Sequence, residues 1–182
     1  MEWKETIPLV LLLTLTGAVS APASEQPLET VSHVDLQRYL GTWYEIATIP
    51  ARFQKGCVVV TATYTLRPDG QISVLNRCRK HTLDGPEKIA RGKAWVVDKA
   101  TNAKLRVQFF WPFSGAYWII ELDSEYQYAV VGHPGRKYLW ILARRPHIPQ
   151  PLYQELLARI AAKGYDTSLI TKTLQPETLQ TP

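Results

Sequence analysis

The stretch that decides the fold is Tyr39-Leu40-Gly41-Thr42-Trp43-Tyr44-Glu45-Ile46-Ala47. Its β-branched and aromatic residues favour a strand, and Pro50 ends the run shortly afterwards. Gly41 allows a close approach of the backbone that a side chain would block. Because Trp43 and Tyr44 are adjacent, their side chains point to opposite faces of the strand, so one of the two faces a core.

Further runs of strand-forming residues follow at short, even intervals, with a turn signal between each pair. The expected strands are residues 58–66, 71–77, 89–98, 104–111, 116–122, 126–131 and 138–143. Eight strands joined in simple succession favour an antiparallel up-and-down β-barrel. After Pro149-Gln150-Pro151, apolar residues recur at helical spacing from Leu152 to Ala161, and Gly164 ends this run. The sequence therefore predicts an all-β fold with one C-terminal α-helix packed outside the barrel, and a short edge strand within residues 165–173.

The beginning of the chain differs in composition from the rest. Residues 7–19 are almost entirely apolar or small, too few to span a bilayer comfortably, and further small residues follow them. This pattern is typical of a secretory signal peptide, with a retained membrane anchor as the alternative. The prediction is a signal peptide at 1–23, a lead-in segment at 24–32, one domain at 33–173 and a flexible tail at 174–182. The composition, 46% hydrophobic and 20% charged over 182 residues, is that of an ordinary globular domain.

Cys57 and Cys78 are the only cysteines in the sequence. In an exported protein such a pair favours a disulfide over two free thiols. The turn at Arg67-Pro68-Asp69-Gly70 places them diagonally across a hairpin, so a bridge requires a bulge or splayed strand ends. The bridge would close a loop of about 20 residues and stabilise the fold by ~3 kcal/mol. Two free thiols remain the alternative.

The formal net charge of +5 favours anionic partners. The basic residues are spread out and no helical reading head is present, so nucleic acid is not expected as a partner. A transient contact with an anionic membrane surface is the expectation, and a solvated mixed surface is the alternative. The aromatic turn Phe109-Phe110-Trp111-Pro112-Phe113 has two interpretations. It is either a lip at the barrel mouth that touches membrane or ligand, or packing over a barrel end.

The stretch Gly41–Ala47 resembles the first signature of the lipocalin family. Arg144, directly after the last expected strand, matches the arginine of the third signature. The middle signature has a looser match in Asp123-Ser124-Glu125-Tyr126. The resemblance covers roughly residues 33 to 172 and is nearest to the branch of bacterial outer-membrane lipocalins and apolipoprotein D. It implies the lipocalin calyx, in which an apolar chamber has one closed end.

In lipocalins the signature tryptophan lies at the closed floor of the barrel and the arginine lies across it. The resemblance therefore implies structural, barrel-closing roles for Gly41, Trp43 and Arg144. A guanidinium over an indole ring contributes roughly 1 to 2 kcal/mol when desolvated. Bacterial members of the branch usually carry a lipid-modified cysteine, which this sequence lacks near the end of its apolar run. The expectation is an exported, soluble protein, either periplasmic or secreted.

The contents of the barrel decide the function, because eight strands either pack solid or enclose one small ligand. If Trp43 faces inward, alternation turns Glu45 and Ala47 inward too, and an apolar lining fixes the parity of the other strands. The inward set includes alanines, which leave room for a ligand. The expected ligand-binding residues are Tyr64, Asn76, Val107, Phe109, Tyr117, Trp140 and Leu142. Tyr64 and Asn76 supply polar tips that could orient a head group. Plain core packing is the alternative for each aromatic residue.

The resemblance implies a small hydrophobic or amphiphilic ligand, of the fatty acid or lysophospholipid class, carried for maintenance of the cell envelope. The main alternative is an enzyme in which a free Cys57 or Cys78 is the nucleophile and His133 or Glu45 the base. No compact catalytic or metal-ligand spacing supports it, because the histidines are scattered. Catalytic residues, metal and cofactor are therefore not expected. A third alternative is a solid barrel that serves only as an interaction protein.

Overall fold

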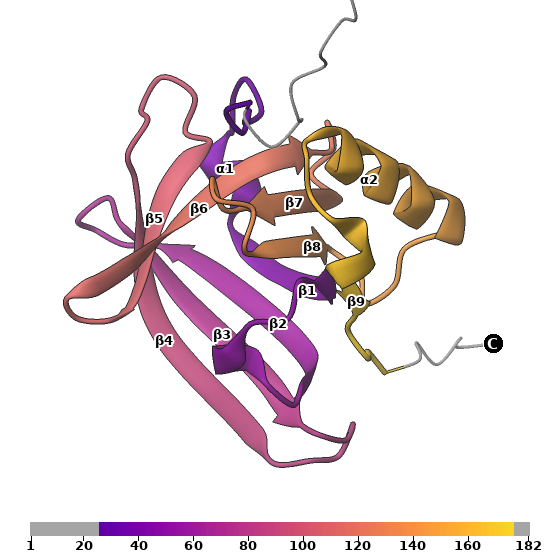
Figure 1. Ribbon diagram of the computed structural model, residues 1–182. Helices are drawn as coiled ribbons and strands as arrows, with labels where there is room; N and C mark the ends of the chain where they lie inside the picture. The colour runs from indigo at the N-terminus through magenta and orange to yellow at the C-terminus, as the bar shows by residue number, and fades with distance from the viewer. Residues whose placement is uncertain (1–25, 177–182) are drawn as a thin grey trace, which may run out of the picture.

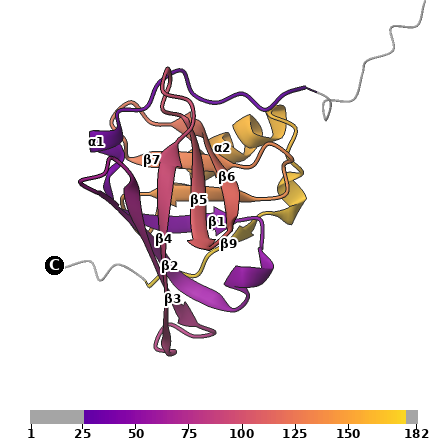
Figure 2. The same ribbon diagram turned by 90° about the vertical axis from the view of Figure 1, so that its left-hand side faces the viewer.

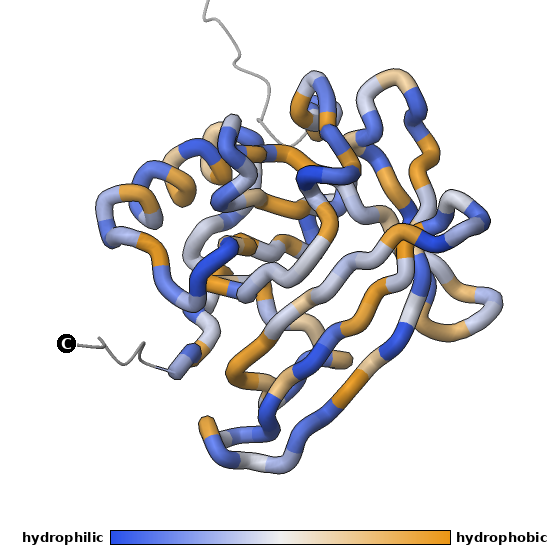
Figure 3. Tube along the Cα trace, turned by 180° about the vertical axis from the view of Figure 1, so that it is seen from behind, coloured by the Kyte–Doolittle hydropathy of each residue, from blue (hydrophilic) through white to orange (hydrophobic). Residues whose placement is uncertain are grey.

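Eight strands with alternating polar and apolar residues curl into one antiparallel ring in the computed structural model, which describes residues 26–176 (Figures 1 and 3). The strands are β1 (Gly41–Thr48), β2 (Cys57–Leu66), β3 (Ile72–Lys80), β4 (Glu87–Val96), β5 (Lys104–Phe110), β6 (Phe113–Leu122), β7 (Tyr128–Gly132) and β8 (Leu139–Ala143). Each strand pairs with the next, and β1 pairs with both β2 and β8, so the ring closes. The expected up-and-down barrel is confirmed.

Most strand starts differ from the expected ones by one to three residues, and local structure explains two of these differences. β7 begins at Tyr128 and not at residue 126, because Tyr126 adopts a positive φ of 59° in the preceding turn. β6 begins at Phe113 and not at residue 116, because Phe113 already pairs with Phe110 across the turn. The aromatic turn is therefore the tip of a long β5–β6 hairpin.

The apolar side chains form two separate clusters. One lies inside the barrel and includes Trp43, Leu105 and Ile119. The other lies between the outer face of β1, β6, β7 and β8 and the helix α2 (Gln150–Ala162), which buries Tyr153, Leu156 and Ile160 there. Figures 1 and 2 show α2 on one side of the barrel, behind the strands β4 to β6 in the second view. The expected external helix is confirmed.

The segment before β1 packs more closely than a simple lead-in. Leu28 is buried, and the Val31 amide donates to the Ile119 carbonyl oxygen at 3.0 Å. A short helix that the sequence did not suggest, α1 (Leu36–Tyr39), follows at the closed end of the barrel. Its N-cap is Asp35, whose carboxylate accepts hydrogen bonds from the Gln37 and Arg38 amides. Residues 1–23, the expected signal peptide, lie outside the described part of the chain.

The segment after α2 returns to the barrel. It contains a 3-10 turn, η3 (Thr167–Leu169), and the short strand β9 (Thr171–Lys172), which pairs with β1. The expected edge strand is thus present, although it is only two residues long. Packing continues to Gln175, which the sequence analysis placed in the flexible tail, and this side chain is buried. Over residues 26–176, none of the helices is long and apolar enough to cross a membrane.

Candidate functional site

The floor of the barrel is built around Trp43, whose side chain is fully buried. The guanidinium carbon of Arg144 lies 3.8 Å from the centre of the Trp43 rings. The guanidinium also donates hydrogen bonds of 2.7–3.3 Å to the carbonyl oxygens of four residues, which are Arg38, Leu40, Thr42 and Tyr126. This contact was expected from the signature residues. Gly41, with a φ of 92°, allows the approach: a Cβ there would lie 3.4 Å from Arg144 Nη1.

The inner cluster contains most of the side chains that alternation placed inside the barrel. Of the expected ligand-binding residues, it includes Tyr64, Val107, Phe109, Tyr117, Trp140 and Leu142. These residues come from β2, β5, β6 and β8, and their registers bring them to one common interior. Their inward position is therefore established, whereas their contact with a ligand stays a prediction.

Several inner side chains toward the mouth of the barrel are only partly buried. Tyr64, Leu105 and Leu142 are buried, whereas Val107, Phe109 and Trp140 on the same inner face are only half-buried. Phe109 fits against Gly92 of β4, where a Cβ would approach its ring to 2.8 Å. The open end is therefore accessible to solvent, and the closed end is sealed by Trp43 and Arg144.

Three tyrosines form a chain of hydroxyl groups in the lower part of the barrel. Tyr117 Oη lies 2.8 Å from Tyr39 Oη and 2.8 Å from Tyr64 Oη. Burial raises the pKa of Tyr64 to about 12 and raises the pKa of Tyr39 and Tyr117 well above the usual value, so all three remain neutral. Sequence reasoning missed Tyr39, because it lies on α1 and reaches the barrel only through the fold.

A second polar chain connects the lining to the strand β1. Trp140 Nε1 donates to Gln54 Oε1, and Gln54 Nε2 donates to Glu45 Oε2, both at 2.8 Å. Thr173 Oγ1 donates to the other Glu45 oxygen at 2.6 Å. Burial raises the pKa of the Glu45 carboxyl, and these two hydrogen bonds oppose that effect. Gln54 lies in the short turn η2 (Arg52–Gln54), where the sequence pattern carries no signal for it.

Asn76 is the remaining expected site residue. It lies on the same face of β3 as Val74, which belongs to the inner cluster, and pairs with Ala62 of β2. Its Oδ1 atom is buried without a hydrogen-bond partner among residues 26–176. Such an acceptor is costly unless a water or a ligand supplies a donor.

One alternation-based expectation is wrong. Ala47 packs in the outer cluster beneath α2 and not inside the barrel. The pairing of β1 with β8 shifts register between Glu45 and Ala47, and the extra residue of this bulge is Ile46. A bulge turns the following side chains to the other face, which a strict period of two does not anticipate.

Cys57 and Cys78 form the expected disulfide, with their Cα atoms 5.4 Å apart. The required bulge is present in β2 between Val58 and Thr61. The bridge cross-links β2 and β3 near the open end. Because both cysteines of the sequence are in this bond, neither thiol is free to act as the nucleophile of the alternative enzyme. His133, the suggested base, lies in the β7–β8 loop, where its Nδ1 accepts from the Gly135 amide.

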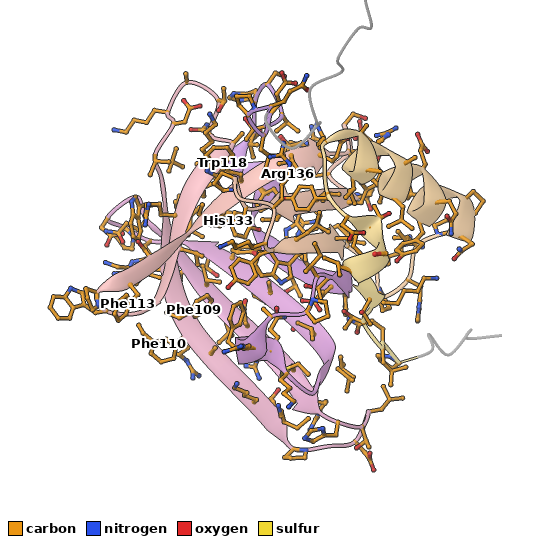
Figure 4. All side chains as sticks on the ribbon, viewed as in Figure 1. Phe109, Phe110, Phe113, Trp118, His133 and Arg136 are labelled. Atoms are coloured by element: carbon orange, nitrogen blue, oxygen red, sulfur yellow. A yellow bond between two sulfur atoms is a disulfide. The ribbon has the colours of Figure 1, made fainter. Side chains whose placement is uncertain are left out.

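The rim of the open end carries exposed apolar side chains. Phe110, Trp111 and Phe113 are 77%, 87% and 76% exposed at the tip of the β5–β6 hairpin. Figure 4 shows Phe110 and Phe113 at the far end of this hairpin, on the side away from α2. Other rim loops add Phe53 and Leu83. These loops, the β7–β8 loop and the adjoining strand ends carry exposed basic residues, which are Arg52, Lys55, Arg79, Lys88 and Lys137, with Asp84 and Glu87 as acidic neighbours.

A separate small groove lies outside the barrel, beside α2 and β9. It is lined by Ile46, Pro146, His147, Ile148, Gln150, Tyr153, Lys172 and Thr173. None of the expected lining residues contributes to it. Over residues 26–176, histidine, cysteine and carboxylate side chains form no group of three or more that could hold a metal ion.

The sequence also matches a known protein family. Residues 34–175 match the model described as a lipocalin-like domain. The chain belongs to the lipocalin family. Among individual proteins, it is 43% identical over 173 residues to the outer membrane lipoprotein Blc of Escherichia coli K12, with 93% of this chain and 97% of that protein covered. It is 36% identical to mouse apolipoprotein D, with 92% and 94% covered.

Solved structures support this lipocalin fold. Insecticyanin from the tobacco hornworm Manduca sexta superposes with a TM-score of 0.67 at 19% identity, covering 86% of this chain and 89% of that one. Apocrustacyanin C2 superposes with a TM-score of 0.63 at 19% identity, covering 79% and 81%. At this identity the likeness concerns the fold alone. The Blc and apolipoprotein D relatives agree with the branch that the signature residues indicated.

Proposed function

We propose that this lipocalin binds and carries a single-chain amphiphile, of the fatty acid or lysophospholipid class, inside its barrel. The main supporting observation is that the barrel is closed at one end only. Trp43 and Arg144 seal the floor, while Val107, Phe109 and Trp140 near the mouth are only half-buried. An acyl chain of matching width would remove these apolar surfaces from water, which contributes ~25 cal/mol per Å² before association costs.

We further propose that the protein collects its ligand at an anionic membrane surface. The exposed aromatic tip of the β5–β6 hairpin and the basic rim residues support this role. Aromatic side chains favour the interface between headgroups and acyl chains, and lysines and arginines are attracted to anionic headgroups. Membrane contact through the rim would bring the open mouth to the source of the lipid.

The role that we propose is binding without catalysis, in an exported protein that serves the maintenance of envelope lipids. The disulfide supports an oxidising compartment. The name of the Escherichia coli relative, an outer membrane lipoprotein, supports an envelope location. Neither Cys57 nor Cys78 is available for attachment of a lipid, because they bond to each other.

The decisive experiment is solvent extraction of the purified protein, followed by mass spectrometry of the extract. A stoichiometric acyl-chain lipid is expected from the wild type, and Trp140→Glu should lose it because a carboxylate would then enter the apolar lining. Trp95→Glu is the matched control: Trp95 neighbours the inward-facing Ala94 on β4 and therefore points outward. Retention of the lipid by a folded Trp140→Glu protein, or an empty wild type that also takes up no added fatty acid or lysophospholipid, would contradict the proposal.

A further inference from the structure

The three tyrosines near the floor of the barrel have more hydroxyl hydrogens than the hydrogen bonds between them require. Tyr39, Tyr64 and Tyr117 each have one O–H donor, and the two contacts of 2.8 Å consume two of these hydrogens. One hydroxyl hydrogen therefore has no acceptor in this chain of contacts, whichever way the hydroxyls rotate. Tyr39 and Tyr64 are only 4% and 7% exposed, so bulk water is largely excluded from this site. A buried donor without an acceptor is costly.

The charged side chains nearest these hydroxyls are already engaged by protein groups. Arg144 lies over Trp43, and four of its five N–H donors bond to backbone carbonyl oxygens. The oxygens of Glu45 accept from Gln54 and Thr173. An anionic headgroup placed here would be desolvated without a side chain that forms a direct ion pair with it, which is unfavourable. The site therefore favours a polar group that is uncharged.

The inner face between the mouth and the tyrosines carries apolar side chains, of which Val107, Phe109 and Trp140 are half-buried. Tyr117 is half-buried and is the member of the group that contacts the open interior. Asn76 lies one inward position closer to the mouth than Val74, the partner of Tyr64, and it offers the buried, unpartnered Oδ1 acceptor. Diagonal neighbours on adjacent strands are within reach of long side chains. The interior thus presents a spare donor and a spare acceptor close together.

We propose that Tyr39, Tyr64 and Tyr117 form a subsite for the uncharged, hydroxyl-bearing end of a long-chain amphiphile, which enters with this end toward the floor. A ligand hydroxyl would accept the spare tyrosine hydrogen and donate its own hydrogen to a tyrosine oxygen or to Asn76 Oδ1. The protonated carboxyl of a fatty acid and the hydroxyl of a long-chain alcohol share this chemistry. The inference rests on the proposed function and specifies which end of the ligand lies at the floor.

The test requires a variant without any of the three hydroxyls, because every subset that retains a tyrosine keeps an unpaired hydrogen. The variant is Tyr39→Phe/Tyr64→Phe/Tyr117→Phe, which preserves the ring volumes. Its control is Tyr44→Phe/Tyr128→Phe, which changes two half-buried tyrosines packed against the outer cluster. Affinities are measured by displacement of the neutral fluorescent probe N-phenyl-1-naphthylamine. The competitors are 1-dodecanol, 1-chlorododecane and dodecanoic acid.

The measured quantity is the affinity for 1-dodecanol relative to 1-chlorododecane, which has neither a hydroxyl hydrogen nor a strong hydrogen-bond acceptor. This ratio should fall by about three- to tenfold in the triple variant, the size of one or two net hydrogen bonds, and should not change in the control. A fall for dodecanoic acid that is larger below the pKa of its carboxyl than above it would identify the protonated carboxyl as a ligand group. An unchanged fatty-acid affinity together with a reduced alcohol ratio would restrict the subsite to alcohols.

An unchanged 1-dodecanol ratio in the triple variant overturns the inference. So does a wild type that prefers 1-chlorododecane to 1-dodecanol as strongly as an alkane solvent does, because an apolar cavity without a hydrogen-bond partner would behave in the same way. The second comparison needs no variant and holds even if the triple variant fails to fold. If no competitor displaces the probe from the wild type, the proposed function itself fails. If all three competitors bind with affinities that follow their hydrophobicity alone, only the tyrosine subsite is overturned.

Discussion

At the scale of single residues, Arg144 is the strongest determinant of the closed floor. Its guanidinium satisfies carbonyl oxygens from the α1 region, β1 and the β6–β7 turn, segments that are distant in sequence. Replacing it by methionine keeps an apolar cover for Trp43 but leaves these carbonyls without a donor. We expect a loss of about 2–3 kcal/mol in the free energy of unfolding, measured by denaturant titration.

The neighbouring Arg145 provides the control for this prediction, because its side chain is exposed. Arg145→Met should change the free energy of unfolding by no more than about 0.5 kcal/mol. If both substitutions lowered the free energy of unfolding equally, the cause would be the loss of a positive charge and not the loss of the contacts that Arg144 makes at the floor.

At the scale of structural elements, the tip of the β5–β6 hairpin carries the most exposed large apolar side chains among the described residues. Phe110 and Phe113 pair across its tip, and Trp111 extends beyond them with little protein around it. Changing these three residues to serine should leave the unfolding free energy nearly unchanged, since they bury little area. The same change should lower binding to vesicles that contain phosphatidylglycerol by at least about tenfold, because it removes the aromatic anchors.

The matched control changes three exposed apolar residues away from the mouth, Leu66, Val97 and Leu169, to serine. Sedimentation of each protein with vesicles measures the binding, and added salt should weaken the wild type if basic rim residues contribute. If both triple variants lost vesicle binding to a similar extent, exposed apolar residues in general would cause the binding, and the β5–β6 hairpin would not be a specific docking element.

At the scale of the whole molecule, alternation and the signature residues predicted the ring of strands and its inward face. They placed Val107, Trp140 and Leu142 correctly, because β5 and β8 carry a strict period of two through these positions. The bulge at Ile46 turns Ala47 outward, and no residue type in this stretch predicts the bulge. Gln54 and Tyr39 escaped prediction because their partners lie 86 and 78 residues away, so only the closed ring brings them together.

The closure of that ring also depends on the C-terminal segment. β1 pairs with β2 through residues 41–44 only, and beyond them the two strands diverge. Gln175 spans the gap: its Nε2 donates to the carbonyl oxygens of Glu45 and Val60 at 2.8 and 3.0 Å. The Val59 amide donates to the Leu174 carbonyl oxygen at 2.7 Å and extends the contact. The barrel is thus completed at this seam by the last described residues of the chain.

Replacing Gln175 by alanine should open the seam, because two buried carbonyl oxygens lose their donor. We expect the free energy of unfolding to fall by about 1–3 kcal/mol and amide hydrogen exchange to accelerate at Val59 and Thr173, whose amides join β2 and β1 to the C-terminal segment. Gln154→Ala, on the exposed face of α2, is the control and should alter neither quantity. Exchange that accelerates equally in all strands would mean that the seam opens only with global unfolding. Selective acceleration at the seam would establish it as the weakest line of the barrel wall.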